Sequence, residues 1–228
     1  MTITHKLTRA AAVSAVLAGL LFVTVQIAHP ALNLALVATP EWKIRQSMKV
    51  LMAVFSLVGI TGMYLSRSAK MGRLGLVGYG LFGSGYLMIA SVEVIGLFVL
   101  PSIATTSPAF VSDVLALAAG GSATGDAGWY KPLTQVTGIA YLAGGLIFGL
   151  AILRARTLAR WAAALLAVGT LATVAITVFP DVNPRLFAIP TGVALIGLGY
   201  SLWRQEDRHT HPTASDPTRS QLNPVNAR

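Results

Sequence analysis

LGLVGYGLFGSGYLMIASV, the stretch at Leu74–Val92, decides the fold of this chain and is followed directly by Glu93. Its nineteen residues carry no charge, and a helix that crosses a membrane needs about 20 apolar residues. Charge-free runs of comparable length occur five more times, at Ala10–Ala28, Val50–Ser66, Pro132–Leu153, Trp161–Pro180 and Leu186–Trp203. We therefore predict an all-α, polytopic membrane bundle of six transmembrane helices.

The composition agrees with a membrane domain that fills most of the chain. Hydrophobic residues make up 54% of the 228 positions and charged residues 11%, whereas soluble proteins have about 25% charged residues. We expect a cytoplasmic leader at residues 1–9, the transmembrane domain at 10–203 and a disordered cytoplasmic tail at 204–228. A cleaved signal peptide is the competing interpretation of residues 1–38, but the first run is too long for a signal and no clean A-x-A site follows.

The basic residues predict the orientation of the bundle. With the N-terminus in the cytoplasm and six crossings, twelve Lys and Arg fall on the inner side and five on the outer side. This bias orients membrane proteins, so the formal charge of +9 indicates topology and attraction to acidic headgroups, not nucleic-acid binding. The inner set is Lys6, Arg9, Arg67, Lys70, Arg73, Arg154, Arg156, Arg160, Arg204, Arg208, Arg219 and Arg228, and the outer set is Lys43, Arg45, Lys49, Lys131 and Arg185.

The two longer outer connections contain further signals. The first, about Ala31–Arg45, begins apolar and ends charged, so part of it is expected in the interface. The second contains SPAFVSDVLALAAGG at residues 107–121. Ser107 can cap a helix with Pro108 at its first position, and Gly120 and Gly121 can end it. This segment is too short to span, so we predict a short outer interfacial helix.

Glu93 lies inside a predicted span, since the third stretch can run on to Leu100, and a charge in that position is a functional candidate. On a helical wheel it shares a face about 80° wide with four glycines of the same span. Small residues let helices approach closely in lipid, so Glu93 is expected to face protein. It is either a proton-titrating or cation-binding group or an interfacial glutamate that bonds a neighbour. The four glycines are Gly75, Gly78, Gly85 and Gly96.

Other polar residues map to the same outer leaflet as Glu93 and together predict a polar cup that opens outward. His29 titrates near neutral pH and could pair with Glu93 or Asp181. A plainer interpretation also holds, because polar residues near the interface are common and threonines in a span often bond the carbonyl one turn back. The members of the predicted cup are Gln26, His29, Glu93, Gln135, Thr177 and Asp181.

Gly145 and Gly149 form a GxxxG pair suited to close helix contact. We interpret it as packing within the bundle in preference to a dimerisation motif. The dinucleotide-like pattern at Gly78, Gly80 and Gly83 follows no strand and is rejected. The chain has no cysteine, Walker loop, HExxH or GxSxG. We expect no metal, no cofactor and no enzymatic activity. For an intramembrane enzyme, the sequence offers no pair of residues that we would assign as a catalytic dyad.

Two segments resemble those of small uncharacterised six-span membrane proteins of bacteria, in which a short basic turn ending in Arg-Trp joins two spans. They are YLAGGLIFGLAILRARTLARWAAALLAVG at Tyr141–Gly169 and ALIGLGYSLWR at the end of the last span. The resemblance covers about the last third of the chain. It implies six spans and a bacterial cytoplasmic (inner) membrane location, and it implies no activity.

The sequence favours a non-enzymatic interaction or envelope-associated component, with both termini cytoplasmic. Its expected partners are the lipid bilayer and a membrane protein or a second copy of the chain. The alternative is a small proton-coupled carrier or permease that uses Glu93 with His29 and Asp181.

Overall fold

The structure, a computed structural model, describes residues 3–27, 32–172 and 188–210, and every regular element in these ranges is helical. The predicted all-α class is therefore confirmed. Three helical stretches are long and apolar enough to cross a membrane, namely Ile3–Gln26, Pro40–Ile103 and Tyr130–Ala155. The elements are α1 (Ile3–Gln26), α2 (Leu34–Val37), α3 (Pro40–Val94), the π-helical turn η1 (Ile95–Val99), α4 (Leu100–Ile103), α5 (Pro108–Ala118), α6 (Tyr130–Ala155), α7 (Arg160–Ala172) and α8 (Ile189–Thr210).

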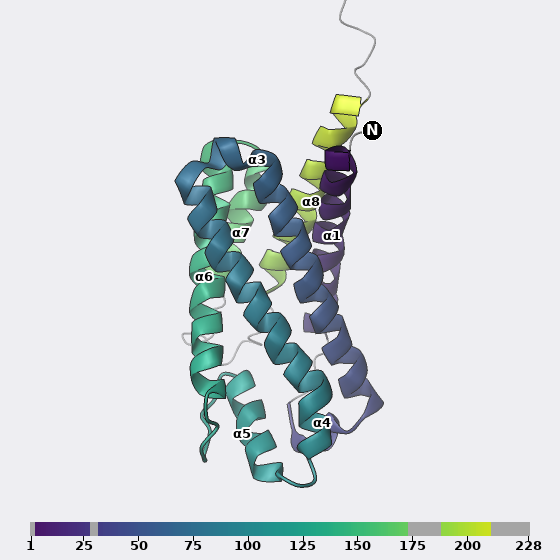
Figure 1. Ribbon diagram of the computed structural model, residues 1–228, viewed down its shortest axis with the longest axis vertical. Coiled ribbons are helices and arrows are strands. Elements are labelled where there is room, and N and C mark those ends of the chain that lie inside the picture. The colour runs from purple at the N-terminus through teal and green to yellow at the C-terminus, as the bar shows by residue number, and fades with distance from the viewer. Residues whose placement is uncertain (1–2, 28–31, 173–187, 211–228) are drawn as a thin grey trace, which may run out of the picture.

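Helix α3 folds back on itself at Gly72, whose backbone has φ 57° and ψ −153° (Figure 1). Only glycine adopts this region without strain. The fold divides α3 into a first arm, residues 40–71, and a second arm, residues 73–94, which run antiparallel. The side chains hold the arms together, because the Thr61 and Tyr79 hydroxyls are 3.2 Å apart and the Tyr64 and Tyr79 rings stack with centroids 4.6 Å apart.

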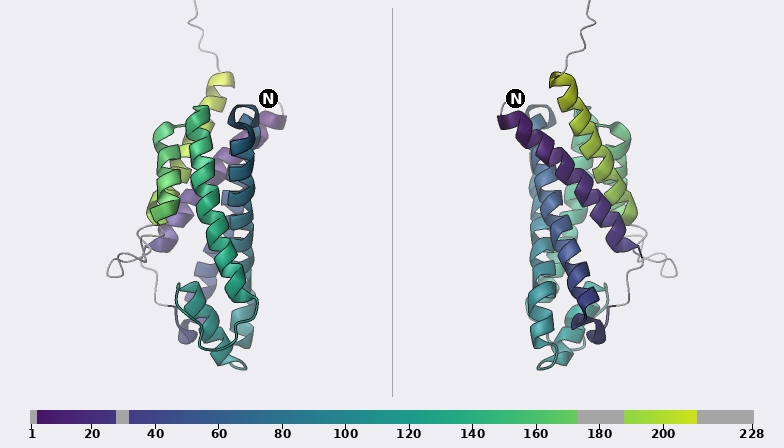
Figure 2. Two further views of the ribbon diagram at one scale, coloured as in Figure 1. Left: turned by 90° about the vertical axis from the view of Figure 1, so that its left-hand side faces the viewer. Right: turned by 90° about the vertical axis from the view of Figure 1, so that its right-hand side faces the viewer.

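The long helices form a closed, up-and-down ring in which α1 packs against both the first arm and α8 (Figure 2). The contacts are close enough that a Cβ added to Gly59 would lie 2.8 Å from the Cβ of Ala15. On the other side of α1, a Cβ at Gly199 would lie 2.7 Å from the carbonyl oxygen of Ala12. Small residues therefore bring these helices together, as is usual where lipid surrounds a bundle.

Large aromatic residues fill the bundle between the second arm and α6. Phe82 and Phe148 are fully buried, and the Phe82 ring centroid lies 4.9 Å from that of Tyr86 and 5.5 Å from that of Tyr141. These separations are typical of attractive aromatic pairs. The aromatic cluster fixes the second arm against α6 and so positions both sides of the site described below.

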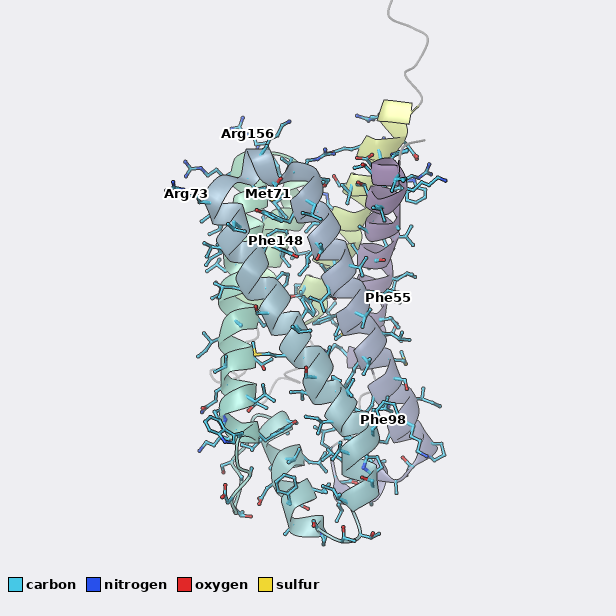
Figure 3. All side chains as sticks on the ribbon, in the orientation of Figure 1. Phe55, Met71, Arg73, Phe98, Phe148 and Arg156 are labelled. Atoms are coloured by element: carbon cyan, nitrogen blue, oxygen red, sulfur yellow. The ribbon has the colours of Figure 1, made fainter. Side chains whose placement is uncertain are left out.

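One end of the bundle, here called the arginine-rich end, contains the start of α1, the fold at Gly72, the α6–α7 turn and the end of α8 (Figure 1). Arg73 and Arg156 are labelled there in Figure 3. The start of α1 and the end of α8 are joined by a hydrogen bond of 2.8 Å between His5 Nδ1 and Glu206 Oε2 and by the Arg9–Asp207 ion pair at 3.2 Å. The opposite end, formed by α4 and α5, is called the α5 end.

Three boundaries differ from those predicted. Helix α3 begins at Pro40, with Thr39 as its N-cap, so the charged part of the first outer connection is helical. The third stretch remains helical through Pro101 to Ile103, by way of η1. At the other end of the chain, α8 continues past Arg204 to Thr210, because Gln205 and Glu206 contact other helices. The predicted disordered tail is therefore corrected to helix for residues 204–210.

The predicted outer interfacial helix corresponds to α5 at Pro108–Ala118, with Pro108 in its first turn. The Ser107 side chain makes no capping hydrogen bond. Gly120 follows the helix with φ 83°, which is the left-handed conformation that commonly ends a helix at glycine. Pro and Gly thus set the limits of α5 as the sequence indicates.

Candidate functional site

A cavity of about 280 Å³ lies at the α5 end of the bundle. The first arm of α3, the second arm with η1, α5 and α6 supply its walls. The polar residues that line it are Gln46, Lys49, Glu93, Thr134 and Thr137, together with the partly polar Trp42 and Tyr130. A cavity enclosed by four helical segments with few polar groups has the general character of a small-molecule binding site.

Trp42, Gln46 and Lys49 reach the cavity from one face of the first arm, because residues four and three apart on a helix are neighbours. Trp42 is 6% and Gln46 is 4% exposed, so the face is packed against protein. Thr39 caps this arm by accepting a hydrogen bond of 3.3 Å from the Trp42 amide, and Pro40 and Glu41 follow in the first turn. This start pattern fixes where the first arm begins and places the three side chains at the cavity.

Glu93 approaches the same point from the second arm. Its Oε2 accepts a hydrogen bond of 2.7 Å from Gln46 Nε2 and lies 3.5 Å from Lys49 Nζ. The Lys49 and Glu93 side chains are only 16% and 17% exposed. The carboxylate therefore has an opposite charge and an amide donor beside it, which lowers the cost of keeping it away from water.

The π-helical turn next to Glu93 follows from Pro101. Because proline has no N–H, the chain shifts its hydrogen bonding, and the Leu100 amide bonds the Ile95 carbonyl five residues back. Pro101 leaves the Gly96 carbonyl, which is also five residues back, without that partner. Trp42 Nε1 donates to this carbonyl at 2.8 Å. The Gly96 carbonyl, which has no backbone donor from Pro101, thus orients the Trp42 indole on the cavity wall.

Gly96 also allows the polar side chains of the first arm to reach the second arm. A Cβ at this position would overlap the Gln46 amide and lie 3.9 Å from the Trp42 ring. The absence of a side chain therefore leaves space for the Gln46–Glu93 hydrogen bond.

Asp113 holds the loop that follows α5 against that helix. Its Oδ1 accepts hydrogen bonds from the Thr124 amide at 2.7 Å and the Thr124 hydroxyl at 2.9 Å, and its Oδ2 accepts from the Gly125 amide at 3.0 Å. The Thr124 amide, followed by the Thr124 hydroxyl, lowers the pKa of Asp113 below its ordinary value, because hydrogen bonds to the charged form favour it.

An apolar groove of about 740 Å³ adjoins the polar cavity on the side of α6. The two share the lining residues Leu100, Val114 and Tyr130, so these side chains lie at the boundary between them. The rest of the groove is lined mainly by aliphatic and aromatic side chains from the second arm, η1, α5 and α6. Trp129 lines it as well and is 87% exposed. A polar compartment therefore lies directly beside an apolar one.

The structure brings one member of the predicted polar cup, Glu93, to this cavity. Gln26 ends α1 and Gln135 is exposed on α6, and neither lines the cavity. His29, Thr177 and Asp181 lie outside the described residues.

Sequence reasoning missed the three residues of the first arm that face Glu93. The sequence places Lys49 only among the outer basic residues and gives Trp42 no partner, whereas in the structure Lys49 lies beside Glu93 and Trp42 bonds the Gly96 carbonyl. The spacing Trp42–Gln46–Lys49, read together with the helix-start pattern Thr39-Pro40-Glu41, is the signal that could have indicated a common face.

The predicted packing glycines lie at several contacts. Gly78 and Gly85 face α6, where an added Cβ would lie 2.5 Å from the Phe148 amide and 2.9 Å from the Tyr141 amide, respectively. Gly75 lies against Met71 and Gly96 against the first arm. Gly145 and Gly149 face α7, at Thr170 and Ala167. These four glycines therefore allow close contact with two neighbours, α6 at Gly78 and Gly85 and the first arm at Gly75 and Gly96.

Within the described ranges, no three His, Cys, Asp or Glu side chains are grouped closely enough to hold a metal ion. Comparison with protein families, characterised proteins and solved structures finds no match to this chain.

Proposed function

We propose that this protein is a non-enzymatic, six-span integral membrane protein of the bacterial cytoplasmic membrane that binds an amphiphilic membrane lipid at the α5 end. Its headgroup occupies the polar cavity and an acyl chain occupies the apolar groove. Both termini and the arginine-rich end face the cytoplasm in this proposal, which places the site in the outer leaflet. It is a form of the interaction component that the sequence favours.

The single observation that carries the proposal is the shared wall of Leu100, Val114 and Tyr130 between a charged cavity and an apolar groove. A lipid has the same division between a polar head and an apolar chain. The Lys49–Glu93 pair offers both a positive and a negative charge to a headgroup. The apolar groove buries the surface of an acyl chain. A water-soluble ligand would use only the cavity.

Narrowing the groove tests the proposal. Val136 lines the groove and is 53% exposed, whereas Ile139 is 68% exposed on the same helix and does not line it. We expect Val136→Trp to weaken lipid retention in detergent by at least about tenfold, equal to roughly 1.4 kcal/mol, and Ile139→Trp to leave it unchanged. Native mass spectrometry of the purified chain with phosphatidylethanolamine measures this. Equal retention by both variants, or none by the unaltered chain, would overturn the proposal.

A proton-coupled carrier is less well supported by the same geometry. A carrier of this kind needs Glu93 to exchange protons during the transport cycle, and here the carboxylate is engaged by Lys49 and Gln46. The chain reconstituted in liposomes should therefore show no pH-dependent flux that Glu93→Gln abolishes. Such a flux would favour the carrier over the binding protein.

A further inference from the structure

A second pocket, of about 250 Å³, lies at the arginine-rich end between the start of α7 and the last turns of α8. It is separate from the cavity beside Glu93. Arg204 and Arg208 line it from successive turns of α8, and both are exposed. Two guanidinium groups on one wall make this pocket strongly positive.

The neighbouring acids are engaged with other groups. Glu206 bonds His5 and lies 3.8 Å from Arg67, and Asp207 lies 3.2 Å from Arg9. Within the part of the chain that the structure describes, neither Arg204 nor Arg208 forms an ion pair with a carboxylate. The Arg204 guanidinium lies over the Tyr200 ring, 5.8 Å from its centroid, and both arginines line the pocket without a carboxylate partner, so an anion can approach them.

The pocket is held in shape by hydrogen bonds between α8 and the α6–α7 turn. Ser201 Oγ accepts from the Ala159 amide at 2.9 Å, and Gln205 Nε2 donates to the Thr157 carbonyl at 2.7 Å. These bonds place the first turn of the thirteen-residue helix α7 at the pocket. The positive end of the helix dipole adds to the two guanidinium charges there.

Exposed aromatic side chains form the rest of the opening. Trp161 is 59% and Tyr200 is 57% exposed, and both line the pocket. Gly197 allows the Trp161 ring to lie against α8, because a Cβ there would overlap the ring. Trp and Tyr favour the level of lipid headgroups, so the pocket has a charged part and a part suited to the interface.

We infer that this pocket binds the phosphate of an anionic phospholipid of the cytoplasmic leaflet. Arginine matches phosphate oxygens with paired N–H groups, and basic pockets between membrane helices take acidic headgroups. A zwitterionic lipid would bring an ammonium group toward Arg204 and Arg208. A free phosphate would make no use of Trp161 and Tyr200. The inference does not depend on the lipid site proposed at the α5 end.

Matched pairs of arginine substitutions test the inference. The variant Arg204→Gln/Arg208→Gln removes the pocket charges, whereas Arg154→Gln/Arg156→Gln removes two charges from the same end at residues that do not line the pocket. An interfacial arginine contributes about 1 kcal/mol to binding of acidic lipid, so the first variant should bind phosphatidylglycerol about thirtyfold more weakly. The second should bind nearly as well as the unaltered chain. Native mass spectrometry in detergent, with phosphatidylcholine of matched chains as reference, measures both.

Several outcomes would overturn the inference. An equal loss in both variants would indicate general attraction to a charged surface, and no loss in either would exclude the pocket. Inorganic phosphate that displaces phosphatidylglycerol at millimolar concentration would indicate a free-anion site.

A second measurement needs no change to the arginines. Phosphatidylglycerol brominated near the headgroup should quench tryptophan fluorescence, and Trp161→Phe should remove a distinct part of this quenching. Quenching that is the same with and without Trp161 would also contradict the inference.

Discussion

Lys49 and Glu93 form a charge pair that is mostly shielded from water, with side chains 16% and 17% exposed. Such a pair contributes less than its geometry suggests, because both groups lose hydration when they come together. Removing one partner is costly, since the other charge then remains in a poorly hydrated position. The Gln46 amide shares in this arrangement through its 2.7 Å hydrogen bond to Glu93.

Glu93→Gln is therefore expected to lower the free energy of unfolding by about 1–3 kcal/mol, the typical cost of an uncompensated buried polar group. Adding Lys49→Met should restore part of this loss, because the stranded cation is removed. Glu41→Gln is the matched control, since the Glu41 carboxylate is 51% exposed beside Arg45 and such surface pairs contribute little. Thermal unfolding in detergent compares the unaltered chain, Glu93→Gln, Lys49→Met, their double variant and the control. Additive effects of the two site substitutions would contradict the coupling.

Asp113 makes the loop after α5 sensitive to acid. Its pKa lies below the ordinary value of 3.8 because the Thr124 amide and hydroxyl and the Gly125 amide bond its charged form. A carboxyl with a lowered folded pKa contributes stability that is complete above its ordinary pKa and is lost as pH falls through the lower value. The loop should therefore stay ordered at pH 5 and loosen only below about pH 4.

The measurement uses a spin label at Ser122→Cys, an exposed position of this otherwise cysteine-free chain. Mobility of the label should rise only in strong acid, and Asp113→Asn should raise it at every pH. A label that becomes mobile between pH 7 and pH 5 would show that another group controls the loop.

Glu93 could be predicted as a site residue because it is a charge inside an apolar stretch, and such charges are rare in lipid. Its partner Lys49 could not, since nothing in one sequence fixes the register between the two arms of α3. The same limit applies to Trp42, whose partner is a backbone carbonyl 54 residues away. Residue type indicates which side chains need partners, whereas the partners themselves depend on packing.

The helical elements follow more directly from the sequence. Charge-free length predicts the central part of each long helix, and Pro108 and Gly120 set the limits of α5. The sequence places Arg67, Lys70 and Arg73 on the inner side between two predicted spans, but it does not show that the chain reverses there at a single glycine in an unusual backbone region. The turn η1 could not be predicted either, because Pro101 is as compatible with a helix end as with a shifted hydrogen-bond pattern.

Gly72 and Gly80 of helix α3 offer a matched pair of positions for testing the effect of backbone conformation on stability. An added Cβ meets nothing within 4 Å at either position, but only Gly72 has a positive φ. Gly72→Ala should lower the free energy of unfolding by about 1–3 kcal/mol through backbone strain. Gly80→Ala should be neutral or raise it by up to about 1 kcal/mol, because alanine favours helix. Thermal unfolding in detergent compares them, and a neutral Gly72→Ala would show that the fold does not need this conformation.

The whole molecule has unlike ends. Among the described residues, ten basic and two acidic side chains belong to segments at the arginine-rich end, whereas the α5 end has four of each. The basic excess is assembled from four separate parts of the chain: the start of α1, the fold of α3, the α6–α7 turn and the end of α8. Helix packing thus gathers charges that the sequence spreads over some two hundred positions. A bilayer would retain such an end in the cytoplasm.

Labelling of single cysteines tests this orientation, because the chain has no cysteine of its own. Asp126 lies in the loop after α5, and Ala155 ends α6 at the arginine-rich end. In intact cells stripped of the outer membrane, a membrane-impermeant maleimide should label Asp126→Cys and leave Ala155→Cys unlabelled, since the proposed orientation places the basic end in the cytoplasm. Permeabilised cells should label both, which controls for burial of the thiol. Labelling of Ala155→Cys alone before permeabilisation would show that the orientation is the reverse of the proposed one. Both proposed lipid sites would then lie in the opposite leaflets.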